Sequence, residues 1–240
     1  MTKWKQFARR VTAWFLPERC VFCGEVIAPF AVACRRCRET LSVIQPPICH
    51  YCGARKKECH CGKRRLSVDG VAAPFYYEGA ARDGVLRLKR EDDPDAIAYF
   101  ARQLCTVIRR EYQVEEIDGI VFVPMTVRAR REREYNQGEL LAHAVGRQLS
   151  RPVYNALVKL YETPPQKALD LHARSGNVLG VFDVTDRSVR GKTLLLVDDV
   201  LTTGATLHEC AKMLKLYGAE RVPAAVIAVR KITEKTDEIV

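Results

Sequence analysis

The chain has no long apolar segment. None of the hydrophobic runs in its 240 residues approaches the roughly 20 residues that a membrane-spanning helix needs, and its start lacks the pattern of a secretory signal. These absences argue against an integral membrane protein or a secreted one and favour a cytoplasmic location. Without an oxidising compartment, disulfides are a poor explanation for the ten cysteines of the chain.

Acidic residues are scarce in the first 70 positions. That segment holds 14 lysines and arginines against five aspartates and glutamates, together with eight of the ten cysteines, whereas the other 170 residues are nearly balanced in charge. The chain is long enough for one sizeable α/β core plus something smaller. We therefore predict a separate amino-terminal module, with a basic amphipathic helix over residues 1–16 and a cysteine-rich part over 17–65. The apolar stripe of that helix would dock on the protein itself, on a partner protein, or on the inner face of an anionic membrane.

The cysteines of this module come in pairs. A C-x2-C turn directs two thiolates at one centre, and two such turns about ten residues apart complete a four-cysteine zinc site. The second group is less regular, because its last pair reads C-x-C, so His50 or His60 could replace a thiolate, or the two groups could share ligands. We expect one or two structural Zn2+ sites, formed by Cys20, Cys23, Cys34, Cys37, Cys49, Cys52, Cys59 and Cys61.

Three basic clusters accompany the cysteines, at residues 35–38, 55–57 and 63–65. A basic surface with exposed aromatic side chains is typical of proteins that bind single-stranded nucleic acid, because bases stack on the rings. Phe22 and Tyr51 are the candidate stacking residues. The alternative is an ordinary solvated basic face.

The most informative stretch is residues 194–206, which reads LLLVDDVLTTGAT. Its apolar start predicts a buried parallel strand that ends at Val197. Ligands bind beyond the carboxyl ends of such strands, where Asp198 and Asp199 follow. Adjacent carboxylates accept hydrogen bonds from vicinal hydroxyls, directly or through a hydrated Mg2+, so they suit a ribose. Without the residues that follow, two aspartates that simply cap a loop would explain the pattern as well.

Small and hydroxyl-bearing residues come next and lead into an expected helix. Successive backbone N–H groups at a helix N-terminus bind anions, and hydroxyl groups add donors, so this turn suits a phosphate. A ribose site and a phosphate site a few residues apart describe a ribose 5-phosphate. The residues of the phosphate turn are Thr202, Thr203, Gly204, Ala205 and Thr206.

The whole stretch closely resembles the thirteen-residue 5-phosphoribosyl 1-pyrophosphate (PRPP) binding motif of type I phosphoribosyltransferases. The resemblance implies that Asp198 and Asp199 contact the ribose hydroxyls of PRPP or of a nucleoside 5'-phosphate, and serve catalysis if the chain is an enzyme. It also implies that residues 202–206 hold the 5-phosphate and that Mg2+ accompanies PRPP.

Strand and helix patterns alternate along residues 66–240. We expect strands over 68–78, 117–124, 152–160 and 221–229, and helices over 79–88, 96–112, 132–149 and 206–217. This alternation, taken with the motif, predicts an α/β domain with a type I phosphoribosyltransferase-like parallel sheet flanked by helices. A small double zinc ribbon would precede it.

Two polar segments are candidates for the rest of the ligand site. An arginine-rich loop follows the strand over 117–124, and guanidinium groups there suit a pyrophosphate, although a solvated helix start is the plainer interpretation. Type I phosphoribosyltransferases have a mobile loop in the region of residues 161–180, which implies a lid that excludes water from the reacting centre. The pyrophosphate and lid candidates are Arg128, Arg131, Gln166 and Arg174.

Longer matches narrow the resemblance to the ComF family of competence proteins. Arg131, Arg133, Asn136 and Gln137 follow its R-x-R-x-x-NQ pattern, a T-x-x-Q-x-x-L element begins at Thr163, and the paired cysteines belong to the same pattern. The chain departs from the family at the C-x-C pair and where Glu134-Tyr135 replaces a usual Gly-Phe. The resemblance implies a PRPP-binding role in single-stranded DNA uptake during natural transformation, beside a DNA-translocating ATPase.

Two further absences bear on activity. Thr202 stands where purine salvage enzymes of the hypoxanthine-guanine type carry an aspartate base, and the Met1-Thr2 start offers no amino-terminal cysteine for a glutamine amidotransferase. No residue stands out as a base that would activate an acceptor. Three function classes stay open: an accessory protein of DNA uptake, an active phosphoribosyltransferase with an unidentified acceptor, and a zinc-dependent interaction module that uses the fold as a scaffold.

Overall fold

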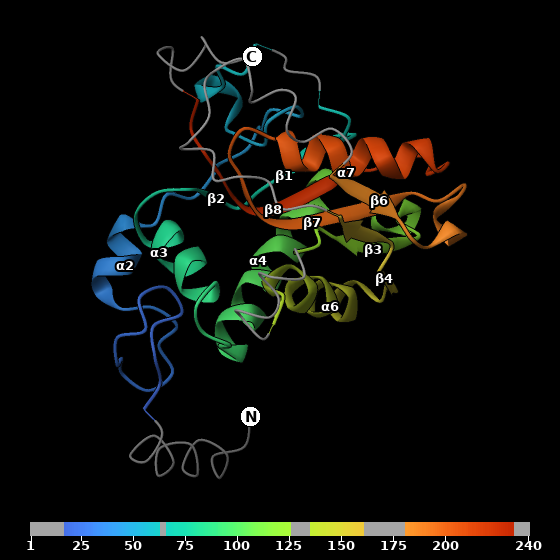
Figure 1. The fold of residues 1–240 in the computed structure, drawn as a ribbon. Coiled ribbons are helices and arrows are strands. Elements are labelled where there is room, and N and C mark those ends of the chain that lie inside the picture. The colour runs from blue at the N-terminus through green and yellow to red at the C-terminus, as the bar shows by residue number, and fades with distance from the viewer. Residues whose placement is uncertain (1–16, 63–65, 126–134, 161–180, 233–240) are drawn as a thin grey trace.

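A parallel sheet forms the centre of the molecule (Figure 1). The computed structural model describes residues 17–62, 66–125, 135–160 and 181–232. The strand order is β1-β8-β7-β3-β4, and β2 also pairs with β8. The predicted parallel sheet is therefore confirmed. Its strands are β1 (Val71–Ala72), β2 (Phe75–Tyr76), β3 (Gly119–Phe122), β4 (Val153–Tyr154), β7 (Leu194–Leu201) and β8 (Ala224–Val229).

Helices cover both faces of this sheet, as Figure 1 shows. One face carries α3 (Gly79–Leu88), α4 (Pro94–Glu111) and α6 (Gln137–Leu149). The opposite face carries α7 (Ala205–Leu216) and a two-stranded antiparallel sheet. That small sheet consists of β5 (Leu157–Lys159) and β6 (Phe182–Val184). The short helices are α2 (Arg35–Thr40) and the 3-10 turns η1 (Lys56–Glu58), η2 (Val114–Glu116) and η5 (Arg187–Val189).

Local sequence explains where the longest helix begins. Asp93 caps α4, because its carboxylate accepts hydrogen bonds from the N–H groups of Asp95 and Ala96, both at 3.0 Å. Pro94 occupies the first helical position, where its missing N–H costs nothing. The helix buries an apolar stripe that includes Phe100 and Leu104 against the sheet. It therefore starts two residues before the predicted position.

Three predicted strands differ from the observed ones. The strand at the start of the LLLVDDVLTTGAT stretch was predicted to end at Val197. This prediction is wrong, because that strand, β7, stays paired with β8 as far as Leu201. The strand expected over 68–78 is divided into β1 and β2 at Pro74, which has no N–H for the sheet. The strand expected over 152–160 is also divided, since β4 joins the central sheet and β5 pairs with β6.

The two cysteine groups pack on different parts of the core. The first group belongs to the apolar cluster beneath α3, α4 and α6, where the ring of Phe22 meets those of Phe75 and Phe100. The second belongs to the cluster on the α7 face, through Cys52 and Cys61. The amino-terminal module therefore packs against the sheet domain at two separate places. In the part of the chain that the structure describes, no helix is both long enough and apolar enough to cross a membrane.

Candidate functional site

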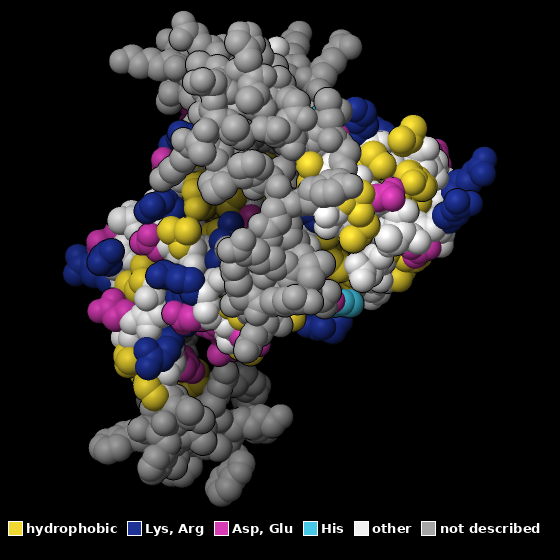
Figure 2. Space-filling model, in the orientation of Figure 1, with side chains coloured by type: hydrophobic (Ala, Val, Ile, Leu, Met, Phe, Trp, Pro, Cys, Tyr) yellow, Lys and Arg dark blue, Asp and Glu magenta, His cyan; other side chains and the backbone are white. Residues whose placement is uncertain are grey.

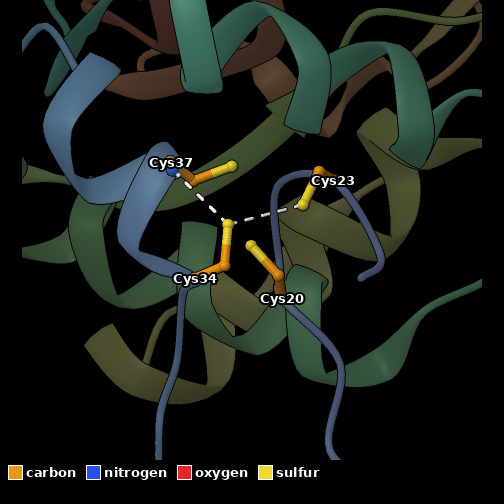
Figure 3. A group of neighbouring side chains, drawn as sticks. All are labelled: Cys20, Cys23, Cys34 and Cys37. Atoms are coloured by element: carbon orange, nitrogen blue, oxygen red, sulfur yellow. Dashed lines mark hydrogen bonds between the residues drawn. The ribbon is translucent and has the colours of Figure 1, made fainter. Parts of the chain in front are cut away.

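Four cysteines of the first group converge on one point (Figure 3). Cys20, Cys23, Cys34 and Cys37 place their Sγ atoms within 4.8 Å of one another, and the Sγ atoms of Cys23 and Cys34 are 3.8 Å apart. Cys34 also caps α2, because the N–H of Cys37 lies 3.4 Å from its sulfur. Cys20 and Cys23 thus face Cys34 and Cys37, which lie at the start of α2, across a space that fits a single ion.

The second group forms an equally compact cluster from consecutive cysteines. Cys49, Cys52, Cys59 and Cys61 have their Sγ atoms within 4.8 Å of one another. The separations are 3.8 Å for Cys49 and Cys61, 3.5 Å for Cys52 and Cys59, and 3.3 Å for Cys59 and Cys61. Neither histidine replaces a thiolate, and the two groups do not share ligands. The short C-x-C spacing therefore does not prevent a four-sulfur cluster.

Both clusters have the dimensions of a tetrahedral zinc site. Zn–S bonds of about 2.3 Å in a tetrahedron place the sulfur atoms about 3.8 Å apart, close to the separations in both clusters. Gly24 and Gly53 follow the first C-x2-C turn of each group with φ of 76° and 72°, a backbone conformation that glycine adopts without steric cost. The residues present fit two structural Zn2+ ions, each with four protein ligands and no open position.

The two motif aspartates lie near the carboxyl end of β7, within the strand. Since consecutive strand residues point to opposite faces, Asp199 faces the α3 side and Asp198 faces the α7 side. The N–H of Asp199 donates to Oδ1 of Asp198 at 2.8 Å. The two carboxylates thus flank the sheet edge that the sequence predicted as the ribose site.

The phosphate turn follows directly after β7. Thr202, Thr203 and Thr206 are exposed, whereas Gly204 is buried and adopts a φ of 84° at the N-cap of α7. Gly204 has no side chain to cap the helix, and Oγ1 of Thr203 lies 3.4 Å from the N–H of Ala205. A Cβ at Gly204 would lie 2.8 Å from Cδ1 of Leu66, so glycine is needed for space as well as for conformation. The turn offers backbone donors at the positive end of a twelve-residue helix.

The electrostatics of the edge are dominated by the two carboxylates. Burial and the negative charge of Asp199 raise the pKa of Asp198 to about 7, although the N–H of Asp199 and the ammonium of Lys89 act in the opposite direction. Burial alone would lower the pKa of Lys89, but the carboxylates of Asp199 and Asp198 outweigh it, so that pKa is raised. The edge therefore favours a bound cation or a hydrogen-bond donor.

Sequence reasoning missed Lys89 as a site residue. Its Nζ lies 2.6 Å from Oδ2 of Asp199, across 110 positions of sequence. The sequence shows Lys89 only as part of a polar turn after α3. Its one signal was a basic residue at the carboxyl end of a predicted helix.

The NQG segment at the start of α6 lies beside the end of β3. Oδ1 of Asn136 caps the helix by accepting from the N–H groups of Gly138 at 3.0 Å and Glu139 at 3.4 Å. Gln137 is buried, and the described residues provide no partner for its Nε2. The neighbour strand of β7 thus ends next to a buried amide with unused donor capacity.

Comparison with known proteins agrees with this arrangement. A family model described as a double zinc ribbon domain matches residues 11–66, and one described as a phosphoribosyl transferase domain matches residues 138–240. Competence protein F of Haemophilus influenzae (strain ATCC 51907 / DSM 11121 / KW20 / Rd) is 29% identical over 220 residues, which cover 87% of this chain and 95% of that protein. Competence protein ComFC of Bacillus subtilis (strain 168) is 26% identical, over 87% of this chain and 85% of its own length. The chain is therefore similar to the ComF competence proteins over most of its length, and it carries matches to both domain models.

A further relative matches the chain over a shorter length. The DNA utilization protein YhgH of Escherichia coli (strain K12) is 33% identical over 115 residues, which are 48% of this chain and 50% of that protein. Several predicted site residues lie outside the residues that the structure describes. These are the pyrophosphate and lid candidates Arg128, Arg131, Gln166 and Arg174, and the amphipathic helix over 1–16.

The two residues predicted to stack on nucleic-acid bases differ in their exposure to solvent. Phe22 is 1% exposed among other aromatic rings, so the prediction that it stacks on nucleic-acid bases is wrong. The cause is its role as the apolar anchor of the first zinc ribbon. Tyr51 is 41% exposed, and it lines a cavity of about 440 Å³ with His50, Leu66, Val68, Asp69 and Arg221.

Proposed function

We propose that this chain binds PRPP with Mg2+ at the carboxyl edge of its sheet and supports the uptake of single-stranded DNA. One observation carries the PRPP assignment. The Asp198 and Asp199 carboxylates near the end of β7 are separated from the N-terminus of α7 only by residues 200–204. Two acceptors for a diol and a nest of donors for a phosphate therefore lie at the two ends of one short turn.

In this proposal each part of the chain has a distinct task. The carboxylates accept hydrogen bonds from the ribose hydroxyls, and the turn donates backbone and threonine hydrogen bonds to the 5-phosphate. The buried amide of Gln137 supports a polar ligand group beside β3, where the arginine-rich loop begins. Carboxylate oxygens suit Mg2+, which when bound would offset the charge of the pyrophosphate. Arg128, Arg131, Gln166 and Arg174 remain proposed contacts of the pyrophosphate and the lid.

Calorimetric titration tests the PRPP assignment and separates it from the alternatives. The zinc-loaded protein is titrated with PRPP, with and without Mg2+, and the same mixtures are assayed for pyrophosphate release. Saturable binding without release supports an accessory protein that senses PRPP. Binding with release, accelerated by an added nucleobase or nucleic acid, identifies an active phosphoribosyltransferase. If PRPP does not bind, the PRPP assignment fails and the fold serves as a scaffold for the zinc ribbons.

The DNA part of the proposal rests on the family and on one surface feature. The relatives named above are competence and DNA utilization proteins, and the role implies a DNA-translocating ATPase as a partner. The exposed ring of Tyr51 lines a cavity that Arg221 also lines. A stacking ring beside a basic side chain is how proteins hold single-stranded bases and phosphates. Lys56 and Lys57, which are exposed on the same ribbon, add positive charge.

Fluorescence anisotropy with a labelled single-stranded oligonucleotide tests this surface. We expect affinity that falls steeply with salt, and a loss of about fivefold or more in Tyr51→Ala, since base stacking contributes about 1–3 kcal/mol. Phe30→Ala is the matched control, because Phe30 is an aromatic residue of the first ribbon with 48% exposure. Equal affinity of the Tyr51 and Phe30 variants, or binding that ignores salt, would remove the surface from the proposal.

A further inference from the structure

Lys89 reaches the candidate PRPP site from outside the motif. Its Nζ lies 2.6 Å from Oδ2 of Asp199, and the two side chains are 31% and 19% exposed, so water screens the ion pair only partly. The described residues provide no hydrogen-bond donor for Oδ1 of Asp199. One oxygen of that carboxylate is therefore held by the lysine and the other is available to a ligand hydroxyl.

The end of α3 that carries Lys89 is itself fixed by a buried arginine. Arg87 is 6% exposed and lies in the last turn of α3, and the N–H of Lys89 bonds to the carbonyl of Val85 as the helix ends. The Arg87 guanidinium contacts Oδ2 of Asp93 at 2.6 Å and Oε2 of Glu91 at 2.8 Å. These two ion pairs fix both the side-chain conformation of Arg87 and the position of the end of α3.

The third partner of Arg87 belongs to the first zinc ribbon. Its Nη1 donates to the carbonyl oxygen of Cys20 at 3.0 Å, in a buried hydrogen bond. Gly24, which closes the same knuckle, leaves the space that this side chain needs, because a Cβ there would lie 2.9 Å from Nε of Arg87. Direct contacts therefore run from Cys20 through Arg87 and the end of α3 to Lys89 and Asp199.

We propose that Lys89 is a positioning residue of the PRPP site and that the first zinc ribbon holds it in place through Arg87. This inference rests on the proposed function. Lys89 fixes the Asp199 carboxylate in the orientation that receives a ribose hydroxyl. It also offsets one of two adjacent negative charges that would otherwise repel a polyanionic ligand. Removal of either the lysine or the aspartate disables the same contact.

A double-mutant cycle on PRPP binding tests the pair. Lys89→Met, Asp199→Ala and the double variant are titrated with PRPP, beside Lys89→Arg and the exposed-lysine control Lys212→Met from α7. We expect the PRPP affinity of Lys89→Met to fall about tenfold and that of Lys89→Arg and Lys212→Met to stay near the wild-type value. The affinity of the double variant should lie within about twofold of that of Asp199→Ala. The proposal would be overturned if the two single-variant losses of PRPP affinity multiplied in the double variant, or if Lys89→Met bound PRPP as well as the wild type.

A second comparison tests the link to the zinc ribbon. Arg87→Lys keeps the charge, but one ammonium nitrogen replaces the three guanidinium nitrogens that reach three separate acceptors. We therefore expect weaker PRPP binding in the wild-type background and no further loss in the Lys89→Met background. Zinc content and far-ultraviolet circular dichroism establish that each variant is folded. An equal loss in both backgrounds would contradict the link. If the wild-type protein itself fails to bind PRPP, the proposed function falls, whereas binding with independent losses removes only the role of Lys89.

Discussion

The backbone N–H of Ser67 donates a hydrogen bond to Nδ1 of His208 at 3.0 Å, which joins the segment after the second zinc ribbon to the start of α7. Leu66, one residue earlier, lies over Gly204 in the phosphate turn. The segment that follows the second ribbon therefore packs against the phosphate turn. In a similar way, the first ribbon contacts the end of α3 beside the aspartates through Arg87. Figure 2 shows basic and acidic side chains interspersed around α2, on the side of the molecule where the first ribbon packs.

Replacement of His208 by alanine should weaken the packing of residues 66–67 against the phosphate turn. The change leaves the N–H of Ser67 without its acceptor, so we expect a loss of about 1–2 kcal/mol in the free energy of unfolding and weaker PRPP binding. Urea denaturation and calorimetry measure the two effects. His143→Ala, an exposed change on α6, should alter neither, and equal stability of the two variants would show that the contact with Ser67 contributes nothing.

Replacement of Gly204 by alanine should damage the phosphate turn specifically. Both a φ of 84° and a contact of 2.8 Å with Leu66 oppose a Cβ at this position, so we expect a stability loss above the roughly 1–2 kcal/mol of conformational strain alone. Gly191→Ala is the matched control, because Gly191 has a φ of 71° and open space around its Cα. The Gly204 variant should lose PRPP affinity while the control keeps it. Equal PRPP binding by both variants would separate Gly204 from the ligand site.

Metal analysis of cysteine variants should find two independent zinc sites. We expect two zinc ions per chain in the wild-type protein, one in Cys37→Ser and one in Cys61→Ser, because each change removes a thiolate from a different cluster. Cys105→Ala is the control, since Cys105 is buried in α4 away from both clusters and should leave the zinc content at two. A wild-type content of one would show that the second cluster does not retain zinc.

The stability of the protein should depend on pH through Asp198. Its pKa of about 7 in the folded state exceeds the ordinary value of 3.8, so between these values the folded state binds more protons than the unfolded one. The stabilisation of the protonated form is therefore complete below pH 4 and is lost as the pH rises to about 7. Asp198→Asn removes this dependence, and we expect it to gain up to ~4 kcal/mol over the wild type at pH 8 but little at pH 4. Urea denaturation at both pH values measures the difference, and parallel pH profiles would contradict the assignment.

Local patterns in the sequence predicted much of this structure. The predicted bounds of α3 and the predicted division of eight cysteines into two groups agree with the structure. Each depends on residues close in the chain or on burial that apolar periodicity reveals. Such features need no knowledge of the tertiary fold.

Features that depend on distant residues were not predictable in the same way. The pairing of β7 with β8 extends the motif strand through the aspartates, and only the observed register shows it. Phe22 is buried because Phe75 and Phe100, more than 50 residues away, surround its ring. The ion pair of Lys89 with Asp199 likewise joins two segments that no local pattern connects.

The role of the carboxyl edge of β7 is decided by PRPP titration of the Asp198→Ala, Asp199→Ala double variant beside the wild-type protein. We expect the wild-type protein to bind PRPP in the presence of Mg2+ and the double variant to lose at least a hundredfold in affinity, with unchanged zinc content and circular dichroism. Unchanged affinity in a folded, zinc-loaded double variant would contradict the assignment of the carboxyl edge of β7 as the PRPP site.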